Sequence, residues 1–138
     1  MIKQIDHPQA WELRHTVMWP DQPYDYIKVE GDESALHYGL FHEGDLKSVI
    51  SLFIEERECQ FRKFATLEEE QGKGYGSRLL EHVLEELKAK GIRRIWCNAR
   101  TEKAGFYSRF GLRETDHHFT KGGKAYVIME MTQASKEG

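Results

Sequence analysis

Residues 72–76 read Gly-Lys-Gly-Tyr-Gly, and hydrophobic periodicity predicts that a helix begins directly after them. Glycine has no Cβ, so the backbone of this segment can turn tightly and approach a ligand closely. Unpaired amides at the start of a helix, together with the positive end of its dipole, favour a phosphate or pyrophosphate group. The residues therefore predict anion binding by the backbone, with Ser77 and Lys73 as candidate side-chain helpers; for Lys73 the alternative is a solvated loop lysine.

Residue spacing excludes two better-known phosphate loops. A Walker-type loop needs glycine followed by Lys and then Ser or Thr, which this segment lacks, and the dinucleotide fingerprint needs a third glycine where Ser77 stands. The pattern that fits is Gln/Arg-x-x-Gly-x-Gly/Ala, with Gln71, Gly74 and Gly76 at the defined positions. It resembles the acetyl-CoA pyrophosphate loop of the GNAT superfamily of N-acetyltransferases.

Length and composition indicate one soluble globular domain. The chain has 138 residues, of which 39% are hydrophobic and 31% charged, enough to build a core. No apolar run approaches the ~20 residues of a membrane span, and no secretory signal is recognised, so we expect a cytoplasmic protein without a membrane partner. A net charge of −3 gives no reason to expect nucleic acid. Cys59 and Cys97 are predicted to be reduced, buried thiols, and no metal site is expected.

Hydrophobic periodicity predicts one domain over residues 1–132 and a solvated tail over residues 133–138. The predicted strands are 2–5, 35–41, 46–54, 59–67, 92–99, 112–120 and 125–131, and the predicted helices are 8–18, 75–90 and 101–109. Strand 59–67 shows continuous alternation of its two faces. Because a helix crosses from it to strand 92–99, these two strands should be parallel. The order of strand, glycine loop and helix places the loop at the carboxyl end of the sheet, where ligands bind in α/β proteins.

A second motif supports the GNAT resemblance. Residues 104–112, Ala-Gly-Phe-Tyr-Ser-Arg-Phe-Gly-Leu, match the short aromatic-rich helix that ends in Gly and an apolar residue in this superfamily. The order of predicted elements also matches, which implies an α/β (α+β) fold with one mixed, largely antiparallel twisted sheet flanked by helices. Residues 13–23 and His37 resemble the ElaA-like branch, although residues 19–21 depart from it, so no substrate is carried over.

The resemblance implies transfer of an acetyl group from acetyl-CoA, the cosubstrate, to a primary amine of a small molecule or peptide by direct attack in a ternary complex. The residues it assigns to cofactor binding are Leu67, Gln71, Gly72, Lys73, Gly74, Tyr75, Gly76, Ser77, Asn98 and Tyr107. Within this set the Leu67 amide is the candidate oxyanion donor. Asn98 would bond the cofactor arm or cap the following helix.

Tyr107 matches the family tyrosine near the thioester sulfur and is the predicted catalytic residue. A phenol with a pKa of about 10 stays protonated at neutral pH and can donate to a thiolate whose pKa is nearer ~8.5. The alternative is a core tyrosine packed with Phe106 and Phe110.

Arg14 and His37 are the candidate substrate-binding residues. Arg14 would bind an acidic group on the acceptor; the alternative is a surface salt bridge. The loop of residues 19–33 would form a wall of the acceptor site or simply carry surface anchors. The general base is open among His37, His117, His118, Glu33 and a water molecule, because strand 59–67 carries no carboxylate.

Two other functions stay open. A non-catalytic module that binds or senses acyl-CoA would use the same fold, and a nucleotide-phosphate-binding protein would use the same loop. Exposed strand edges make a homodimer a reasonable expectation.

Overall fold

The computed structural model describes residues 1–133, and its elements follow the order predicted from the sequence. The strands are β1 (Ile2–Ile5), β2 (Leu36–His42), β3 (Asp45–Glu55), β4 (Glu58–Thr66), β5 (Arg94–Arg100), β6 (Arg113–Lys121) and β7 (Lys124–Thr132). The α-helices are α1 (His7–Met18), α2 (Tyr75–Ala89) and α3 (Ala104–Ser108). Short 3₁₀ turns, η1 (Tyr24–Ile27), η2 (Glu68–Glu70) and η3 (Thr101–Lys103), lie in the connections.

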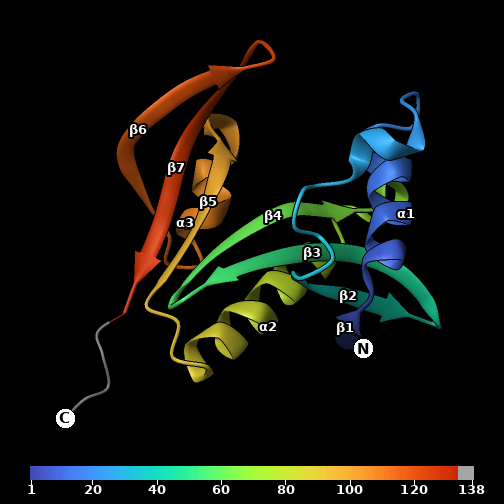
Figure 1. Ribbon diagram of the computed structural model, residues 1–138, viewed down its shortest axis with the longest axis horizontal. Helices are drawn as coiled ribbons and strands as arrows, with labels where there is room; N and C mark the ends of the chain where they lie inside the picture. The colour runs from blue at the N-terminus through green and yellow to red at the C-terminus, as the bar shows by residue number, and fades with distance from the viewer. Residues whose placement is uncertain (134–138) are drawn as a thin grey trace.

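All seven strands form one sheet in the order β1-β2-β3-β4-β5-β7-β6. Every neighbouring pair is antiparallel except β4 and β5, which are parallel as the crossover helix predicts. Helices α2 and α3 pack into one apolar cluster on one face, and α1 packs into a separate cluster on the other. Figure 1 shows α1 and α2 on opposite sides of the strands. The mixed, largely antiparallel sheet flanked by helices confirms the predicted fold class.

Local interactions explain where α1 begins and where α2 ends. Asp6 caps α1, because its carboxylate accepts from the Gln9 amide at 3.2 Å while the Gln9 side chain accepts from the Asp6 amide at 3.3 Å. Helix α2 buries its apolar stripe, and Gly91 follows it with a φ of +79° that favours glycine. The stripe consists of Leu79, Leu80, Val83, Leu84 and Leu87.

Strands β4 and β5 pair only where they begin. Residues Glu58, Cys59 and Gln60 lie opposite Arg94, Ile95 and Trp96, and the two strands then diverge, as Figure 1 shows. The divergence leaves the later half of one edge of β4 without a neighbouring strand. An unpaired row of backbone groups in the middle of a sheet is unusual, because such groups are normally hydrogen-bonded.

A bulge at Lys63 corrects the predicted continuous alternation of β4. Lys63 has a φ of +53°, and the register against β3 shifts between Val49 and Ser51, so β4 contains one extra residue. Before the bulge Phe61 packs into the cluster of α2 and α3; after it Ala65 packs into the cluster of α1. The period-2 pattern in the sequence could not reveal a change of phase within the strand.

The carboxyl end of β7 is tied to the sheet one residue beyond the predicted domain boundary. The Gln133 amide donates to the Arg93 carbonyl at 2.9 Å, and its side chain donates to the Ile92 carbonyl. Gln133, predicted to begin the tail, is thus hydrogen-bonded to the segment that leads into β5, and residues 134–138 lie outside the described residues. Among residues 1–133, no helix combines the length and the apolarity that crossing a membrane would require.

Candidate active site

The glycine loop, residues 71–77, joins the end of β4 through η2 to the start of α2. Gly74 is the N-cap of α2, and no side chain caps the helix there. The Arg78 amide donates to the Gly74 carbonyl at 3.0 Å. Within residues 1–133, no earlier amide of this helix donates to a backbone carbonyl. The amides of residues 75–77 therefore keep their hydrogen-bonding capacity. Together with the helix dipole, they form a site for an anion.

Two glycines of this loop are required for different physical reasons. Gly74 has a φ of +83°, and apart from its chain neighbours no described residue comes within 4 Å of the position where a Cβ would lie, so its backbone conformation is what favours glycine. Gly76 has no such φ; a Cβ there would lie 3.3 Å from Phe64 Cζ and 3.3 Å from Thr66 Oγ1. The second glycine thus lets the first turn of α2 pack closely against the end of β4.

A cavity of about 520 Å³ opens beside the loop. It is lined by Val17, Met18, Phe64, Ala65, Thr66, Glu70, Gln71, Gly72, Gly74, Tyr75, Gly76, Ser77, Lys103 and Phe106. The lining comes from the end of α1, the unpaired half of β4, the glycine loop and the start of α3. The cavity therefore brings most of the loop residues predicted to bind the cofactor together with the later half of β4.

Side chains of the loop fix its position relative to the sheet. Gln71 donates through Nε2 to the Thr66 carbonyl at 3.1 Å, which ties the loop to the end of β4. Lys73 donates to Glu70 at 2.8 Å, and Lys47 donates to the same carboxylate at 3.1 Å. Hydrogen bonds from Lys73 and Lys47 lower the pKa of Glu70. Lys73 thus already has a partner at the edge of the site.

The Leu67 amide, the predicted oxyanion donor, is already in use. It donates to the Lys47 carbonyl at 2.9 Å, so in this structure it points toward β3. Amides alternate between the two edges of a strand, which places those of Phe64 and Thr66 on the unpaired edge toward β5. The nearest free donor to a bound ligand is therefore the amide of Thr66, one residue before Leu67. Which amide is free depends on the register between β4 and β3, and the sequence does not reveal that register.

Tyr107 lies on α3 and packs against aromatic rings. Its ring centroid is 5.8 Å from that of Phe61 and 5.2 Å from that of Phe106. Burial raises the pKa of Tyr107 well above its ordinary value, and the nearby Cys97 adds to the effect, so the phenol keeps its proton. Phe106 lines the cavity, but Tyr107 does not.

Asn98 lies on the diverging part of β5, and its side chain is exposed. Its neighbours Cys97 and Ala99 are buried in the cluster of α2 and α3, so Asn98 projects from the opposite face of the sheet. Cys59 and Cys97 are buried free thiols, as predicted, and burial raises the pKa of each to about 12.

The structure places Arg14 inside the protein, away from the glycine loop. Its guanidinium is fully buried and forms a two-pronged pair with Asp32, with Nη1 to Oδ2 at 2.7 Å and Nη2 to Oδ1 at 2.9 Å. Nη1 also donates to the Ile27 carbonyl at 3.1 Å, and Nη2 to Ser51 Oγ at 2.8 Å. Arg14 thus forms a salt bridge, but a buried one and not the surface salt bridge given as the alternative. It anchors the loop before β2 to α1 and β3.

His37 belongs to the same network and is also buried. Its Nε2 lies 2.8 Å from the Asp32 carbonyl, which can only accept, so Nε2 carries the proton and Nδ1 accepts from Ser51 Oγ at 2.7 Å. Burial lowers the pKa of His37, which favours the neutral ring. Trp11 Nε1 also donates to Asp32 Oδ2, at 2.8 Å. We call Trp11, Arg14, Asp32, His37 and Ser51 the Arg14 network.

The other candidates for the general base lie apart from the cavity. Glu33 is exposed in the loop before β2, and His117 and His118 are exposed on β6. None of the three lines the cavity beside the glycine loop.

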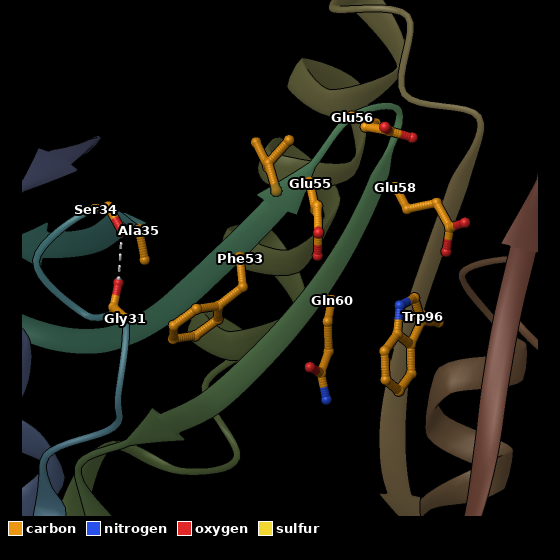
Figure 2. Close-up of a pocket in the computed structure, with 10 residues that line it drawn as sticks. Gly31, Ser34, Ala35, Phe53, Glu55, Glu56, Glu58, Gln60 and Trp96 are labelled. Carbon is orange, nitrogen blue, oxygen red and sulfur yellow. Dashed lines mark hydrogen bonds between the residues drawn. The ribbon is translucent and has the colours of Figure 1, made fainter.

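A second hollow of about 430 Å³ lies on the sheet face that carries α1, at the end where β4 and β5 are paired. Figure 2 shows Phe53, Gln60 and Trp96 projecting from three neighbouring strands, with Glu55 and Glu58 above them. The carboxylates that line this hollow give this end of the sheet face a negative charge. One of them, Glu58, is already paired with Arg94 at 3.1 Å.

The family model described as the acetyltransferase (GNAT) domain matches residues 3–133. The chain belongs to the GNAT acetyltransferase family. It is 32% identical to the N-acetyltransferase YitI of Bacillus subtilis (strain 168) over 141 aligned positions, covering 95% of each chain. These matches confirm the predicted superfamily and the predicted enzyme class, an acyltransferase.

Solved structures of GNAT proteins share the fold at lower identity. Escherichia coli ElaA superposes with a TM-score of 0.79 at 16% identity, covering 94% of this chain and 97% of that one. A GNAT acetyltransferase of Elizabethkingia anophelis with acetyl-CoA bound gives a TM-score of 0.77 at 17% identity, covering 96% and 97%. A GNAT protein with this architecture thus binds acetyl-CoA.

Proposed function

We propose that this GNAT protein transfers the acetyl group of acetyl-CoA to a primary amine of a small molecule or peptide, by direct attack in a ternary complex. The observation that carries the proposal is the glycine loop, whose amides at residues 75–77 have no backbone acceptor in the described part of the chain and border a cavity of about 520 Å³. A site of this kind suits a pyrophosphate.

The residues that would hold acetyl-CoA follow from the free hydrogen-bonding groups. The amides of the loop hold the pyrophosphate, with Ser77 at the cavity wall, and the unpaired edge of β4 at Phe64 and Thr66 pairs with amide groups of the cofactor arm. Acetyl-CoA supplies an acetyl group activated as a thioester. The contribution of the protein is to fix that group against the acceptor, which replaces a costly encounter of two free molecules.

Tyr107 is the proposed proton donor to the departing thiolate. Because burial keeps its pKa above the ordinary value, its hydroxyl is protonated at any physiological pH and can donate. Tyr107 does not line the cavity itself, but its ring packs edge-on against that of Phe106, which does.

Calorimetric titration with acetyl-CoA, CoA, ATP and NAD tests the loop assignment. Binding of the CoA species alone supports it, and absence of CoA binding refutes it. Release of free thiol with a panel of primary amines then tests catalysis. Tight CoA binding without thiol release would favour the non-catalytic module instead.

Tyr107→Phe tests the proposed acid. General acid catalysis is worth roughly 10²–10⁴-fold, so the turnover number should fall by about that factor while the affinity for acetyl-CoA stays the same. Tyr126→Phe, whose ring stacks on Phe119 at 5.2 Å on the outer strands, is the matched control. Equal turnover in the Tyr107 variant and the control would remove Tyr107 from the reaction.

A further inference from the structure

Lys63 combines an unusual backbone with an unpartnered charge. Among residues 1–133, three non-glycine residues have positive φ. Glu43 and Glu56 lie at hairpin turns, whereas Lys63, at +53°, lies within a strand. Such a conformation costs energy for a residue with a Cβ, and it is retained only where the surrounding structure fixes it. The Lys63 side chain extends from the bulge to Trp19, the C-cap residue of α1.

The ammonium group of Lys63 rests on an aromatic ring and has no ionic partner. Its Nζ lies 4.5 Å from the centroid of Trp19, and within residues 1–133 it makes neither a salt bridge nor a hydrogen bond. Desolvation by burial lowers the pKa of Lys63 to about 8, and nearby positive charges add to the shift. A half-buried cation of this kind would gain from an anionic ligand.

The charges that face Lys63 come from several elements and are mostly positive. Arg62 adjoins it on β4 and Lys121 ends β6; both act to lower its pKa, as does Arg14 on α1. Asp32 is the acidic group that acts on Lys63 in the opposite sense, but it is paired with Arg14. Arg62, Lys63 and Lys121 therefore remain as a surplus of positive charge, which we call the basic cluster.

The basic cluster lies next to the proposed transfer site. Lys63 immediately precedes Phe64, and Trp19 immediately follows Met18; both Phe64 and Met18 line the cavity of about 520 Å³. Trp19 also packs edge-on against Tyr26 at 5.3 Å, so the loop after α1 forms the wall behind Lys63. Neither Lys63 nor Trp19 lines the cavity itself, but each adjoins along the chain a residue that does, and the ammonium lies over the first residue of the loop that was expected to face the acceptor.

We propose that Lys63, supported by Arg62 and Lys121, binds an acidic group of the acceptor, so that the acceptor class is a primary amine that also carries a carboxylate. This inference rests on the proposed function, because the ligand is taken to be the amine acceptor of acetyl transfer. It differs from the expectation for Arg14, whose charge is taken up by Asp32. Polyamines and other purely cationic amines would be repelled by the same cluster.

Amine pairs matched in size test the proposal. At saturating acetyl-CoA, β-alanine is compared with β-alaninamide, and a short peptide with Asp after its N-terminal residue is compared with its Asn counterpart. Hydrogen bonds to charged groups are strong enough for a preference of about tenfold in kcat/KM for the carboxylate member. Lys63→Met should abolish the preference by raising KM, while the affinity for acetyl-CoA stays the same.

Lys3→Met is the matched control, because Lys3 Nζ also lies over an aromatic ring, 4.8 Å from the centroid of Phe41, but on β1. This variant should keep the full preference. No preference in the wild type, or a preference that Lys63→Met leaves intact, overturns the proposal. Weaker acetyl-CoA binding in Lys63→Met would overturn it too, since Lys63 would then be a cofactor contact.

A second readout separates this proposal from the acetyl transfer itself. In protein labelled with ¹³C at lysine Cε and saturated with CoA, the Lys63 signal is assigned by its loss in Lys63→Met and titrated with pH. Added β-alanine should raise the Lys63 pKa from about 8, and β-alaninamide should not. A rise in the Lys63 pKa without thiol release would support the anion site and refute acetyl transfer. Thiol release without a rise in the Lys63 pKa would support acetyl transfer and refute the anion site.

Discussion

The glycine loop and the Arg14 network both contain groups that bind anions, and both are regions where the sequence predicts ligand contacts. In the loop, the amides of residues 75–77 have no backbone acceptor among the residues that the structure describes. In the network, both terminal nitrogens of Arg14 already donate to protein oxygens, and only the buried Nε has no partner within residues 1–133. The comparison teaches that residue type names a possible ligand, whereas unused hydrogen-bonding capacity decides whether the protein can bind it.

The two regions should fail in different ways when they are damaged. Loss of a partner in the network leaves a charge buried without compensation, which destabilises the fold. Damage to the loop removes hydrogen bonds that the folded protein makes only with its ligand. Unfolding measurements and cofactor affinity therefore separate the two.

Asp32→Ala should have the largest effect. It leaves the Arg14 guanidinium buried without a counter-charge, so the free energy of unfolding should fall by about 3–5 kcal/mol. The measurement is urea unfolding, with Asp25→Ala as the control, because Asp25 forms an exposed pair with Lys28. Any variant protein that remains folded should bind acetyl-CoA with unchanged affinity. A loss of stability no larger than that of the control would show that the network is not structural.

Acid should weaken the Arg14 network by protonating Asp32. Burial alone would raise the pKa of Asp32, but hydrogen bonds from Arg14, Trp11 and the Val29 amide lower it to about 2. A lowered folded-state pKa stabilises the protein above the unfolded value, and this contribution is lost as the pH falls from about 4 towards 2.

The expected loss from this one group is about 2 kcal/mol over that range. It is measured as the difference in unfolding free energy between pH 5 and pH 2.5. Asp32→Asn has no carboxylate at this position and should show a smaller difference. Parallel pH profiles for the two proteins would contradict the assigned cause.

Gly74→Ala should damage the loop with a smaller effect on the fold. A Cβ at a φ of +83° costs roughly 1–2 kcal/mol, so the loop relaxes and its amides turn away from the anion. We expect the affinity for acetyl-CoA to fall about tenfold, which corresponds to ~1.4 kcal/mol. Gly122→Ala, at a φ of +59° in the turn between β6 and β7, imposes a similar strain away from the cavity. Equal affinities of the two variants, measured by calorimetry, would place the anion elsewhere.

Lys73→Ala should have the smallest effect. Its ammonium is exposed and held by Glu70, so it adds little to an anion site built from backbone amides. We expect no more than about a threefold loss of acetyl-CoA affinity at physiological salt, where exposed charges are screened. Lys90→Ala, at the other end of α2, is the control. A loss as large as that of Gly74→Ala would mean that the side chain, and not the backbone, dominates the site.

The sequence by itself determined the order of elements, the position of the glycine loop and the family. These follow from local signals: the leucine period of α2, the spacing of Gln71, Gly74 and Gly76, and the crossover that makes β4 and β5 parallel. Each is decided within a few residues or by one connection, so no knowledge of distant contacts is needed.

Only the tertiary structure decided which polar groups are free. Arg14 meets Asp32 across 18 positions of sequence, the Leu67 amide meets Lys47 across a strand pair, and the bulge at Lys63 turns the second half of β4 over. A hydrogen-bonding group binds a ligand only when no part of the folded chain has taken it. That outcome depends on contacts between residues far apart in the sequence, and such contacts exist only once the chain has packed.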